Sequence, residues 1–174
     1  MKKYFVLMLA MIGIVGLAGC QSGGKDEATE VKGVVSGNTY SFDFPKNWLS
    51  VDGFEEINAD ADLLYGNKDQ SRLVSVVAEP KADFESFDAY QKLVEDNLAT
   101  ITDTVPEFKK LDNFKGKEAE FSAISQGMSL AYEYYILETD KSYIQLYSWS
   151  MSGDFEDAKP ELLKVMDSFK VISE

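Results

Sequence analysis

The stretch from Met128 to Ser150 constrains the fold most, because it holds two strand-length segments that are apolar on both sides. They are separated by Asp140-Lys141, a short polar turn that favours antiparallel neighbours. In the first segment one face carries Leu130, Tyr132, Tyr134 and Ile136, and the other carries Ala131, Glu133, Tyr135 and Leu137. In the second, Ile144 and Leu146 oppose Tyr143, Tyr147 and Trp149. A strand with one solvated face alternates apolar and polar residues, so these strands are expected in a sheet covered on both sides.

Two other segments have a helical period. Within residues 83–103 the apolar side chains recur every three to four residues, at Phe87, Tyr90, Val94, Leu98 and Ile101. This helix is expected to start near Ser86. A second helix is expected within residues 154–169. Its regular part is expected to begin around Asp157 to Pro160, because a proline in a helix interior costs about 3 kcal/mol.

The other strand-length segments are separated by turn residues. The segments are 38–49, 63–65, 73–78, 108–114 and 118–125, and the turn residues between them include Pro45, the polar run 66–71, Gly116 and Gln126-Gly127. Two helices separated by a run of antiparallel strands, with a sheet that is apolar on both faces, predict an α+β fold. The expected architecture is a single-domain three-layer α/β/α sandwich with a central, mostly antiparallel sheet.

The first twenty residues have the pattern of a signal peptide. Lys2 and Lys3 precede an uncharged and mostly apolar run, which is shorter than the ~20 residues that a membrane-spanning helix needs. The run leads to Leu17-Ala18-Gly19-Cys20, which resembles a bacterial lipobox. That resemblance implies signal-peptidase recognition of Leu17, Ala18 and Gly19, cleavage before Cys20, and transfer of diacylglycerol to the Cys20 thiol.

The expected organisation therefore has three parts. Residues 1–19 are a signal peptide, residues 20–37 are a lipidated N-terminus and a flexible Gly- and Ser-rich tether, and residues 38–174 are the folded domain. The lipid would anchor the protein to the cell membrane on its extracytoplasmic side. Covalent diacylglycerol on Cys20, with an N-acyl chain as a further addition, is the only bound group that we expect.

The composition removes several kinds of chemistry. The 174-residue chain has no histidine, and Cys20 is its one cysteine, so zinc sites, disulfides and Ser-His-Asp catalysis lack their residues. The formal net charge is −13, and it becomes −15 when Lys2 and Lys3 leave with the signal peptide. Such acidity argues against nucleic acid as a partner. We expect no enzymatic activity, no metal site and no nucleic-acid binding.

Acidic residues nevertheless invite two alternatives. The acids Asp52, Glu55, Glu56, Asp60, Asp62 and Asp69 lie in one stretch, as calcium ligands do, but their spacing does not match a calcium-binding loop, and a solvated acidic loop is favoured. Two candidate carboxylate pairs for glycoside hydrolysis are Glu118 with Glu120 and Glu133 with Glu138. A solvated margin of the sheet is the favoured interpretation of these pairs.

Aromatic residues are dense in the last two long strands. Six of them are candidates for lining an apolar ligand pocket: Tyr132, Tyr134, Tyr135, Tyr143, Tyr147 and Trp149. Packing between the sheet and the helices is the favoured role, because aromatic strand residues usually serve it. If a ligand-binding site exists, Tyr143, Tyr147 and Trp149 are its best candidates.

Several features together resemble the PsbP-like superfamily, which includes the bacterial DcrB-like lipoproteins. They are Phe44-Pro45 followed by Trp48, the helix from Phe87 to Ile101, the Gly116 turn, and the closing Asp167-Ser168-Phe169-Lys170-Val171. The resemblance covers Tyr40 to Val171 in the order and type of elements. It implies an antiparallel sheet flanked by helices and, in most bacterial members, an exported lipoprotein without known catalysis.

The better-understood members of that superfamily are accessory proteins that bind other proteins. We therefore expect a lipid-anchored, non-catalytic accessory or binding protein, whose partner is a protein of the bacterial cell envelope. The alternative is a carrier of a small molecule or a lipid, which would use an aromatic pocket on the sheet.

Overall fold

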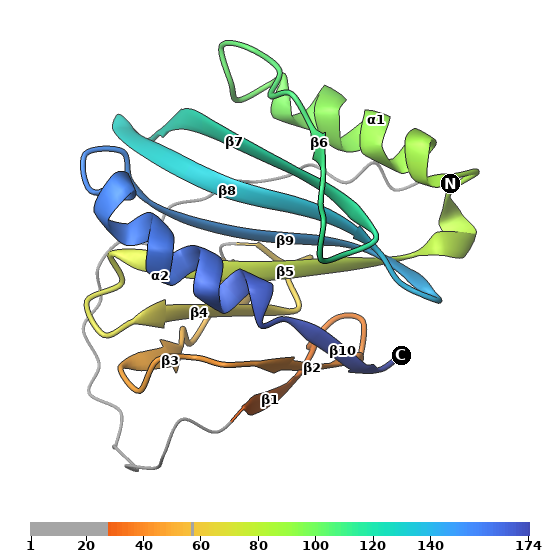
Figure 1. The fold of residues 1–174 in the computed structure, drawn as a ribbon, viewed down its shortest axis with the longest axis horizontal. Helices are drawn as coiled ribbons and strands as arrows, with labels where there is room; N and C mark the ends of the chain where they lie inside the picture. The colour runs from red at the N-terminus through yellow and green to blue at the C-terminus, as the bar shows by residue number, and fades with distance from the viewer. Residues whose placement is uncertain (1–27, 57) are drawn as a thin grey trace.

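The computed structural model describes residues 28–56 and 58–174, and a seven-stranded antiparallel sheet forms its centre (Figure 1). The strand order is β3-β4-β5-β9-β8-β7-β6. The strands are β3 (Trp48–Ser50), β4 (Leu63–Asn67), β5 (Arg72–Pro80), β6 (Lys109–Lys110), β7 (Gly116–Ser125), β8 (Met128–Glu138) and β9 (Ser142–Met151). All neighbouring strands are antiparallel, as the short turns predict.

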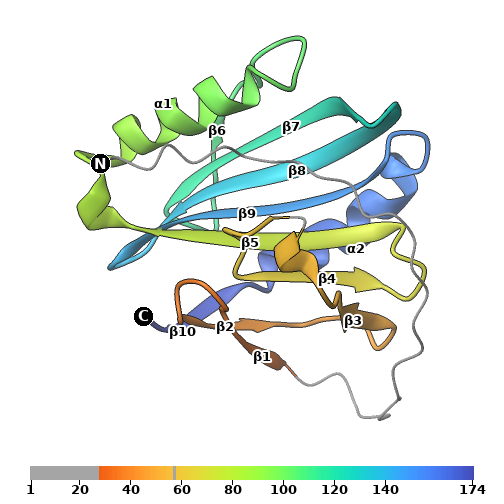
Figure 2. The same cartoon turned by 180° about the vertical axis from the view of Figure 1, so that it is seen from behind.

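Two helices cover the two faces of this sheet. Helix α1 (Phe87–Leu98) buries Tyr90, Val94 and Leu98, and helix α2 (Phe155–Asp167) buries Phe155, Ala158, Leu162, Val165 and Met166. Figure 1 shows α2 across the front of the sheet, and in Figure 2 the strands lie in front of it. Two 3-10 turns, η1 (Phe54–Glu56) and η2 (Lys81–Asp83), lie in the connections. Within the described residues, neither helix has the length and apolar character needed to cross a membrane.

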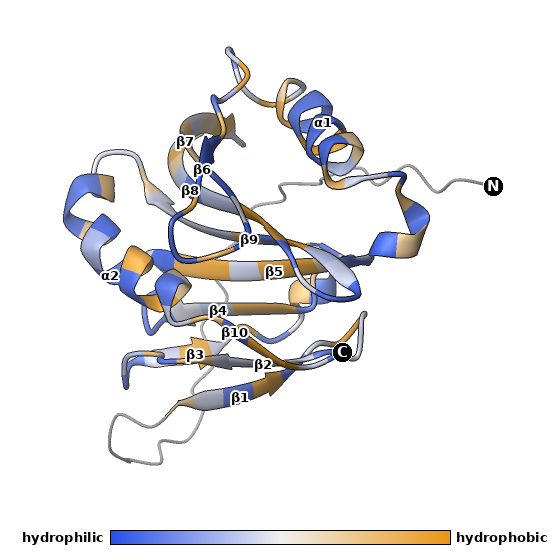
Figure 3. Cartoon of the chain, turned by 45° about the vertical axis from the view of Figure 1, so that its right-hand side comes forward, coloured by the Kyte–Doolittle hydropathy of each residue, from blue (hydrophilic) through white to orange (hydrophobic). Residues whose placement is uncertain are grey.

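The strands β8 and β9 are covered on both faces, which confirms the prediction from their two-sided apolar pattern. On the side of α2 lie Ala131, Tyr135, Leu137, Ile144 and Leu146. On the side of α1 lie Leu130, Tyr132, Tyr134, Ile136, Tyr143 and Tyr147. Strands β4 and β5 are also largely hydrophobic along their length (Figure 3). The predicted α+β class is confirmed: two helices pack on a large antiparallel sheet.

Helix α2 begins earlier than the sequence suggests. It starts at Phe155 rather than within Asp157 to Pro160, and Pro160 lies inside it. The backbone N–H of Ala158 donates to the carbonyl of Asp154 at 3.0 Å, so the turn before the proline is already helical. The reason is burial: Phe155 and Ala158 are 3% and 1% exposed against the sheet, which offsets the hydrogen bond that proline cannot donate.

Helix α1 and strand β6 are shorter than expected. The Ser86 hydroxyl accepts from the N–H of Ala89 at 3.1 Å, so the predicted start is confirmed, but the helix ends at Leu98. Beyond it, the hydroxyl and the backbone N–H of Thr102 both donate to the Leu98 carbonyl, at 2.8 and 3.0 Å. The segment 108–114 forms a strand only at Lys109–Lys110, because Leu111 and Phe114 turn into the cluster beneath α2.

A second, three-stranded sheet has the order β1-β2-β10. It consists of β1 (Thr29–Lys32), β2 (Thr39–Phe42) and β10 (Lys170–Ser173), and it lies at the bottom of Figure 1. Tyr40 and Phe42 are 0% exposed, and their rings lie 5.5 and 5.2 Å from that of Phe169. Residues 28–37, which the sequence places in the tether, thus belong to the fold.

Candidate functional site

The residues of the predicted lipobox, Leu17, Ala18, Gly19 and Cys20, lie outside the described residues. The predicted anchor therefore stays a prediction. The other candidate residues all lie within the described domain, and their positions follow.

Tyr143 lies at the start of β9 beneath helix α1. Its ring stacks on that of Tyr90 at 4.8 Å between centroids, and the rings of Phe84 and Phe87 contact it edge-on at 5.9 and 5.7 Å. The ammonium group of Lys81 lies 5.3 Å from the ring centroid. Tyr143 is only 4% exposed. Its ring is thus held in a packed aromatic cluster beneath α1.

Tyr147 and Trp149 lie further along β9, on the same face. Their rings stack at 5.6 Å, and Tyr147 also stacks on Tyr134 at 5.3 Å. Four residues of strand separate Tyr147 from Tyr143, a rise of about 13 Å. The structure therefore brings Tyr147 and Trp149 together and keeps Tyr143 apart from them. Trp149 is half-buried, while Tyr147 is buried.

The hydroxyl of Tyr132 has no hydrogen-bond partner in the described structure, although the residue is only 1% exposed. Its ring lies between those of Phe121, at 5.0 Å, and Trp149, at 6.0 Å. A buried hydroxyl without a partner costs free energy. Among the described residues it is the one buried side-chain polar atom without a partner.

A polar cluster lies in the same interface, around Gln145. The Gln145 side-chain amide donates to the Tyr90 hydroxyl at 2.9 Å and to the Glu79 carboxylate at 3.2 Å, and its oxygen accepts from the Tyr134 hydroxyl. Burial raises the pKa of Glu79 above its ordinary value, and the negative charges of Asp60 and Asp83 raise it further. Local sequence patterns do not predict this cluster, because its members are distant along the chain.

Of the two acidic pairs considered from the sequence, Glu118 and Glu120 lie on one face of β7, but the second pair is separated. Glu133 and Glu138 lie on opposite faces of β8, and the pair that forms is Glu120 with Glu133, which are register partners across β7 and β8. The ammonium group of Lys159 on α2 contacts both of these carboxylates, at 2.8 Å for Glu133. A hydrogen bond from Lys159 lowers the pKa of Glu120, whereas burial raises that of Glu133.

The acidic residues considered as calcium ligands do not come together. Within the described residues, no group of three or more His, Cys, Asp or Glu side chains is placed to hold a metal ion. Asp62 is 0% exposed and accepts hydrogen bonds from the backbone N–H groups of Val35 and Ser36 at 3.0 and 2.7 Å. The hydroxyls of Ser36 and Tyr40 donate to its other oxygen. Its role is structural.

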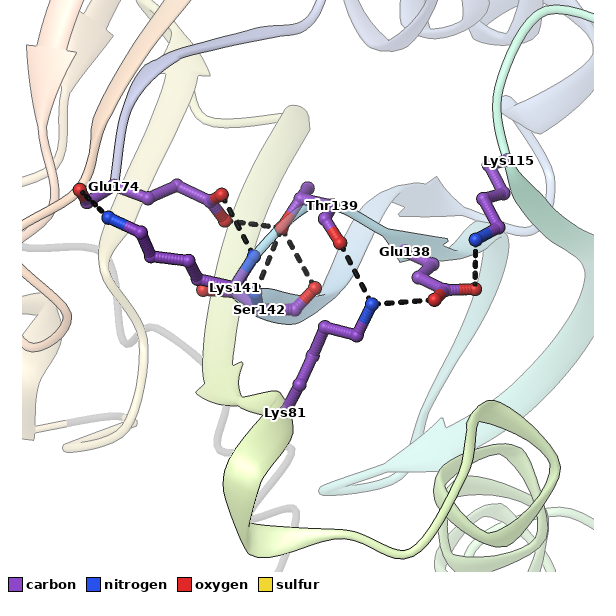
Figure 4. A network of polar contacts seen from close by, with 7 residues as sticks. All are labelled: Lys81, Lys115, Glu138, Thr139, Lys141, Ser142 and Glu174. Carbon is purple, nitrogen blue, oxygen red and sulfur yellow. Dashed lines mark hydrogen bonds and ion pairs between the residues drawn. The ribbon is translucent and has the colours of Figure 1, made fainter.

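A network of lysine and carboxylate groups surrounds the β8–β9 turn (Figure 4). The ammonium of Lys81 contacts one Glu138 oxygen at 2.6 Å, and that of Lys115 contacts the other at 3.0 Å. Lys141 donates through its ammonium to the main-chain oxygen of Glu174 at 2.9 Å. The hydrogen bond from Lys81 lowers the pKa of Glu138, so Glu138 is an anion at neutral pH.

Beside this network lies a pocket of about 310 Å³ between the two sheets. Four apolar residues line it, namely Phe114, Leu137, Phe169 and Val171. Its polar lining consists of Lys115, Glu138, Thr139 and Lys170. Lys115 and Lys170 are exposed, and Lys170 has no ion-pair partner within the described residues. The sequence could not place this pocket, because it forms only where β10 approaches the start of β7.

The pocket depends on Gly116, the first residue of β7. A Cβ atom at this position would lie 2.2 Å from the Ile136 carbonyl oxygen and 3.0 Å from the Leu137 Cα. Only glycine lets β7 begin this close to β8, which brings Phe114 and Lys115 next to Leu137.

No protein-family model matches this chain, and no curated protein matches it. Several solved structures match it. The Ran-binding protein Mog1p of Saccharomyces cerevisiae matches with a TM-score of 0.56 at 11% identity, covering 86% of this chain and 97% of that one. Cyanobacterial PsbP from Synechocystis matches with a TM-score of 0.48 at 14% identity, covering 89% and 98%.

Two further structures also match: one has a lower TM-score, and the other is much longer than this chain. LpqN, which is involved in cell envelope biogenesis of Mycobacterium tuberculosis, has a TM-score of 0.45 at 11% identity, covering 83% of this chain and 90% of that one. The chain spans about half, 46%, of a Bacteroides thetaiotaomicron structure that it matches with a TM-score of 0.49 at 13% identity. The likeness to Mog1p shows the fold alone, an α+β sandwich of the Mog1 kind, which is the architecture that the sequence predicts.

Proposed function

We propose that this protein is a lipid-anchored, extracytoplasmic lipoprotein that acts without catalysis as an accessory or binding protein at the bacterial cell envelope. Leu17-Ala18-Gly19-Cys20 supports the anchor, and the absence of histidine supports a role without catalysis. The observation that carries the binding role is the apolar pocket between the two sheets, with two exposed lysines in its lining.

The pocket suits a protein partner that presents an apolar side chain next to a carboxylate. The apolar side chain would contact Phe114, Leu137 and Val171, and the carboxylate would lie near Lys170. An apolar floor beside a charged rim is the usual anatomy of a protein interface. Lys170 is the better anion-binding group, because Lys115 already contacts Glu138.

The partner is tested by crosslinking in living cells of the native host. A photoreactive p-benzoylphenylalanine in place of Lys115, an exposed residue of the pocket lining, should crosslink to an envelope protein, whereas the same residue in place of Lys68 should not. This substitution leaves Lys170 in place to bind the partner's carboxylate. Lys68 is the matched control because it is exposed and lies in the β4–β5 turn, at the opposite end of the sheet from the pocket. Equal recovery of the envelope protein from both positions, or no recovery from position 115, contradicts the proposed site.

The anchor is tested separately by mass spectrometry of the mature N-terminus. The expected product begins at Cys20 and carries diacylglycerol, and a Cys20→Ser variant should lack lipid and be released or remain unprocessed. A processed Cys20→Ser protein that still fractionates with the membrane would disprove the anchor. This result would leave the crosslinking experiment valid.

A carrier of a small molecule or lipid is the second candidate function. The observation that favours it is the unpartnered hydroxyl of Tyr132 beside the half-buried Trp149. Native mass spectrometry of the full chain, extracted in mild detergent, should then show a retained non-covalent mass, which a Tyr132→Phe variant loses. If both proteins retain no such mass, this second function is wrong.

A further inference from the structure

Strand β7 has a long open edge. It pairs with β8 along its whole length, from Gly116 to Ser125. On its other side it pairs only with β6, and only at Lys117 and Glu118. Residues Ala119 to Ile124 therefore have no strand neighbour on that side within the described part of the chain. Open edges of this length are templates for pairing with another chain, and proteins usually protect them.

The side chains along this edge alternate between two environments. Ala119, Phe121 and Ala123 are buried on the side of α1. Glu120, Ser122 and Ile124 are exposed on the other face, and Ile124 is 73% exposed. Helix α2 packs on the strands further inside the sheet (Figure 1), and its Lys159 contacts Glu120 on this face of β7. An added strand would thus find apolar neighbours on one face, and Glu120, Ser122 and the apolar Ile124 on the other.

The charge of this face is negative. Glu120 and Glu133 share the one ammonium group of Lys159, which leaves one carboxylate charge uncompensated in that cluster. Glu118 lies two residues before Glu120 on the same face of β7, opposite Lys109 of the short strand β6. A cation placed beside Glu120 by a neighbouring strand would make a favourable cross-strand pair.

From this arrangement we infer that the open edge of β7 binds an extended segment of a partner protein by strand addition. The segment carries Lys or Arg at the position beside Glu120, an apolar residue beside Ile124, and apolar residues at the alternate positions beside Ala119 and Ala123, and it ends there because Lys109 of β6 already lies beside Glu118. Main-chain hydrogen bonds would supply affinity, and the alternating side chains would supply specificity.

A second copy of this chain is the less suitable occupant. Antiparallel pairing of two β7 edges about Ser122 would place Glu120 of one chain beside Ile124 of the other, so neither glutamate would meet a cation. Each chain also carries a net charge of −13, which opposes self-association. The inference goes beyond the proposed function, because this surface has the opposite charge preference to the lysine-lined pocket and needs no lipid anchor.

The test uses the full-length protein and a synthetic peptide, acetyl-Val-Val-Thr-Val-Lys-Val-amide, which follows this pattern antiparallel to β7 from Ile124 to Ala119. Saturating peptide should slow hydrogen exchange of backbone amides within Ala119–Ile124 by about tenfold or more. Two control peptides should give no protection there: one with Glu in place of the Lys, and one methylated on alternate backbone nitrogens. The methylated peptide keeps the side chains but cannot complete the ladder.

Protein variants provide an independent readout. By fluorescence anisotropy, Glu120→Lys should weaken peptide binding about tenfold, whereas Glu56→Lys, the same charge change at an exposed site on η1, should leave it within about twofold. If Glu120→Lys fails to fold, Glu120→Gln provides the same comparison at smaller effect. Equal binding of the charge-reversed peptide, protection elsewhere, or protection of Ala119–Ile124 by dimerisation without peptide would each overturn the inference.

Discussion

The phenol of Tyr40 donates a hydrogen bond to the carboxylate of Asp62, which joins strand β2 of the small sheet to the residue before β4 of the large sheet. Burial, together with this hydrogen bond, raises the pKa of Tyr40, so the phenol remains a donor at physiological pH. Asp62 also accepts from Val35 and Ser36, in the turn between β1 and β2. One carboxylate thus fixes the position of the small sheet.

The first prediction concerns this carboxylate. Asp62→Ala should lower the free energy of unfolding by about 3 kcal/mol, because it leaves the buried Tyr40 hydroxyl and the partly buried donors of Val35 and Ser36 without their acceptor. Asp52→Ala, at an exposed position in the same segment, should change it by less than about 0.5 kcal/mol. Urea unfolding followed by circular dichroism measures both. Similar small losses in the two variants would show that Asp62 does not hold the small sheet.

The second prediction concerns the close approach at Gly116. Gly116→Ala should destabilise the fold by about 3 kcal/mol or more, because its Cβ would meet backbone atoms, which cannot move aside as a flexible side chain can. Gly153→Ala is the matched control, since no atom lies within 4 Å of the added Cβ. Thermal unfolding of the two variants distinguishes them. A Gly116→Ala protein as stable as Gly153→Ala would contradict the geometry at the start of β7.

The third prediction is a pH dependence set by Glu79. Because its pKa in the folded state is raised above 4.5, the unfolded chain loses this proton first, so stability falls as pH rises from about 4.5 through the raised value. Glu79→Gln removes this slope and should raise the stability at pH 7 by about 1 kcal/mol. Glu107→Gln, at an exposed site, should keep the slope. Unfolding measured between pH 4 and 8 tests both variants, and an unchanged slope in Glu79→Gln would refute the assignment.

The fourth prediction concerns Lys159. Lys159→Met should cost about 2 kcal/mol at pH 7, because Glu120 and the buried Glu133 would then face each other without a cation. The loss should shrink below about pH 4, where carboxylates become protonated. Lys92→Met breaks an exposed pair with Asp96 and should cost no more than about 0.5 kcal/mol. A loss that does not change with pH would show that Lys159 acts by packing alone.

The central sheet and both helices follow from local pattern, which explains why they could be predicted. In β8 and β9 the apolar residues of both faces were visible in the sequence, and Ser86 marked the start of α1. The start of α2 was misjudged because the cost of Pro160 is local, whereas the compensating burial of Phe155 comes from the sheet.

The site features depend on contacts between distant residues, and the sequence reveals them only where a turn fixes the register. The two-residue turn Gln126-Gly127 places Ser125 opposite Met128, and counting back from it places Glu120 opposite Glu133. The sequence could therefore predict that pair. It could not predict the role of Asp62, since no local pattern distinguishes a buried acceptor from an acid in a solvated loop.

Strand β1 begins at Thr29, so only eight residues lie between it and Cys20. Fully extended, a linker of that length reaches about 30 Å. In the proposed anchored protein, the linker thus keeps the domain within roughly one domain diameter of the lipid headgroups. A partner would therefore have to bind the domain close to the membrane surface. Lengthening the linker would change which complexes can form, although no binding residue is altered.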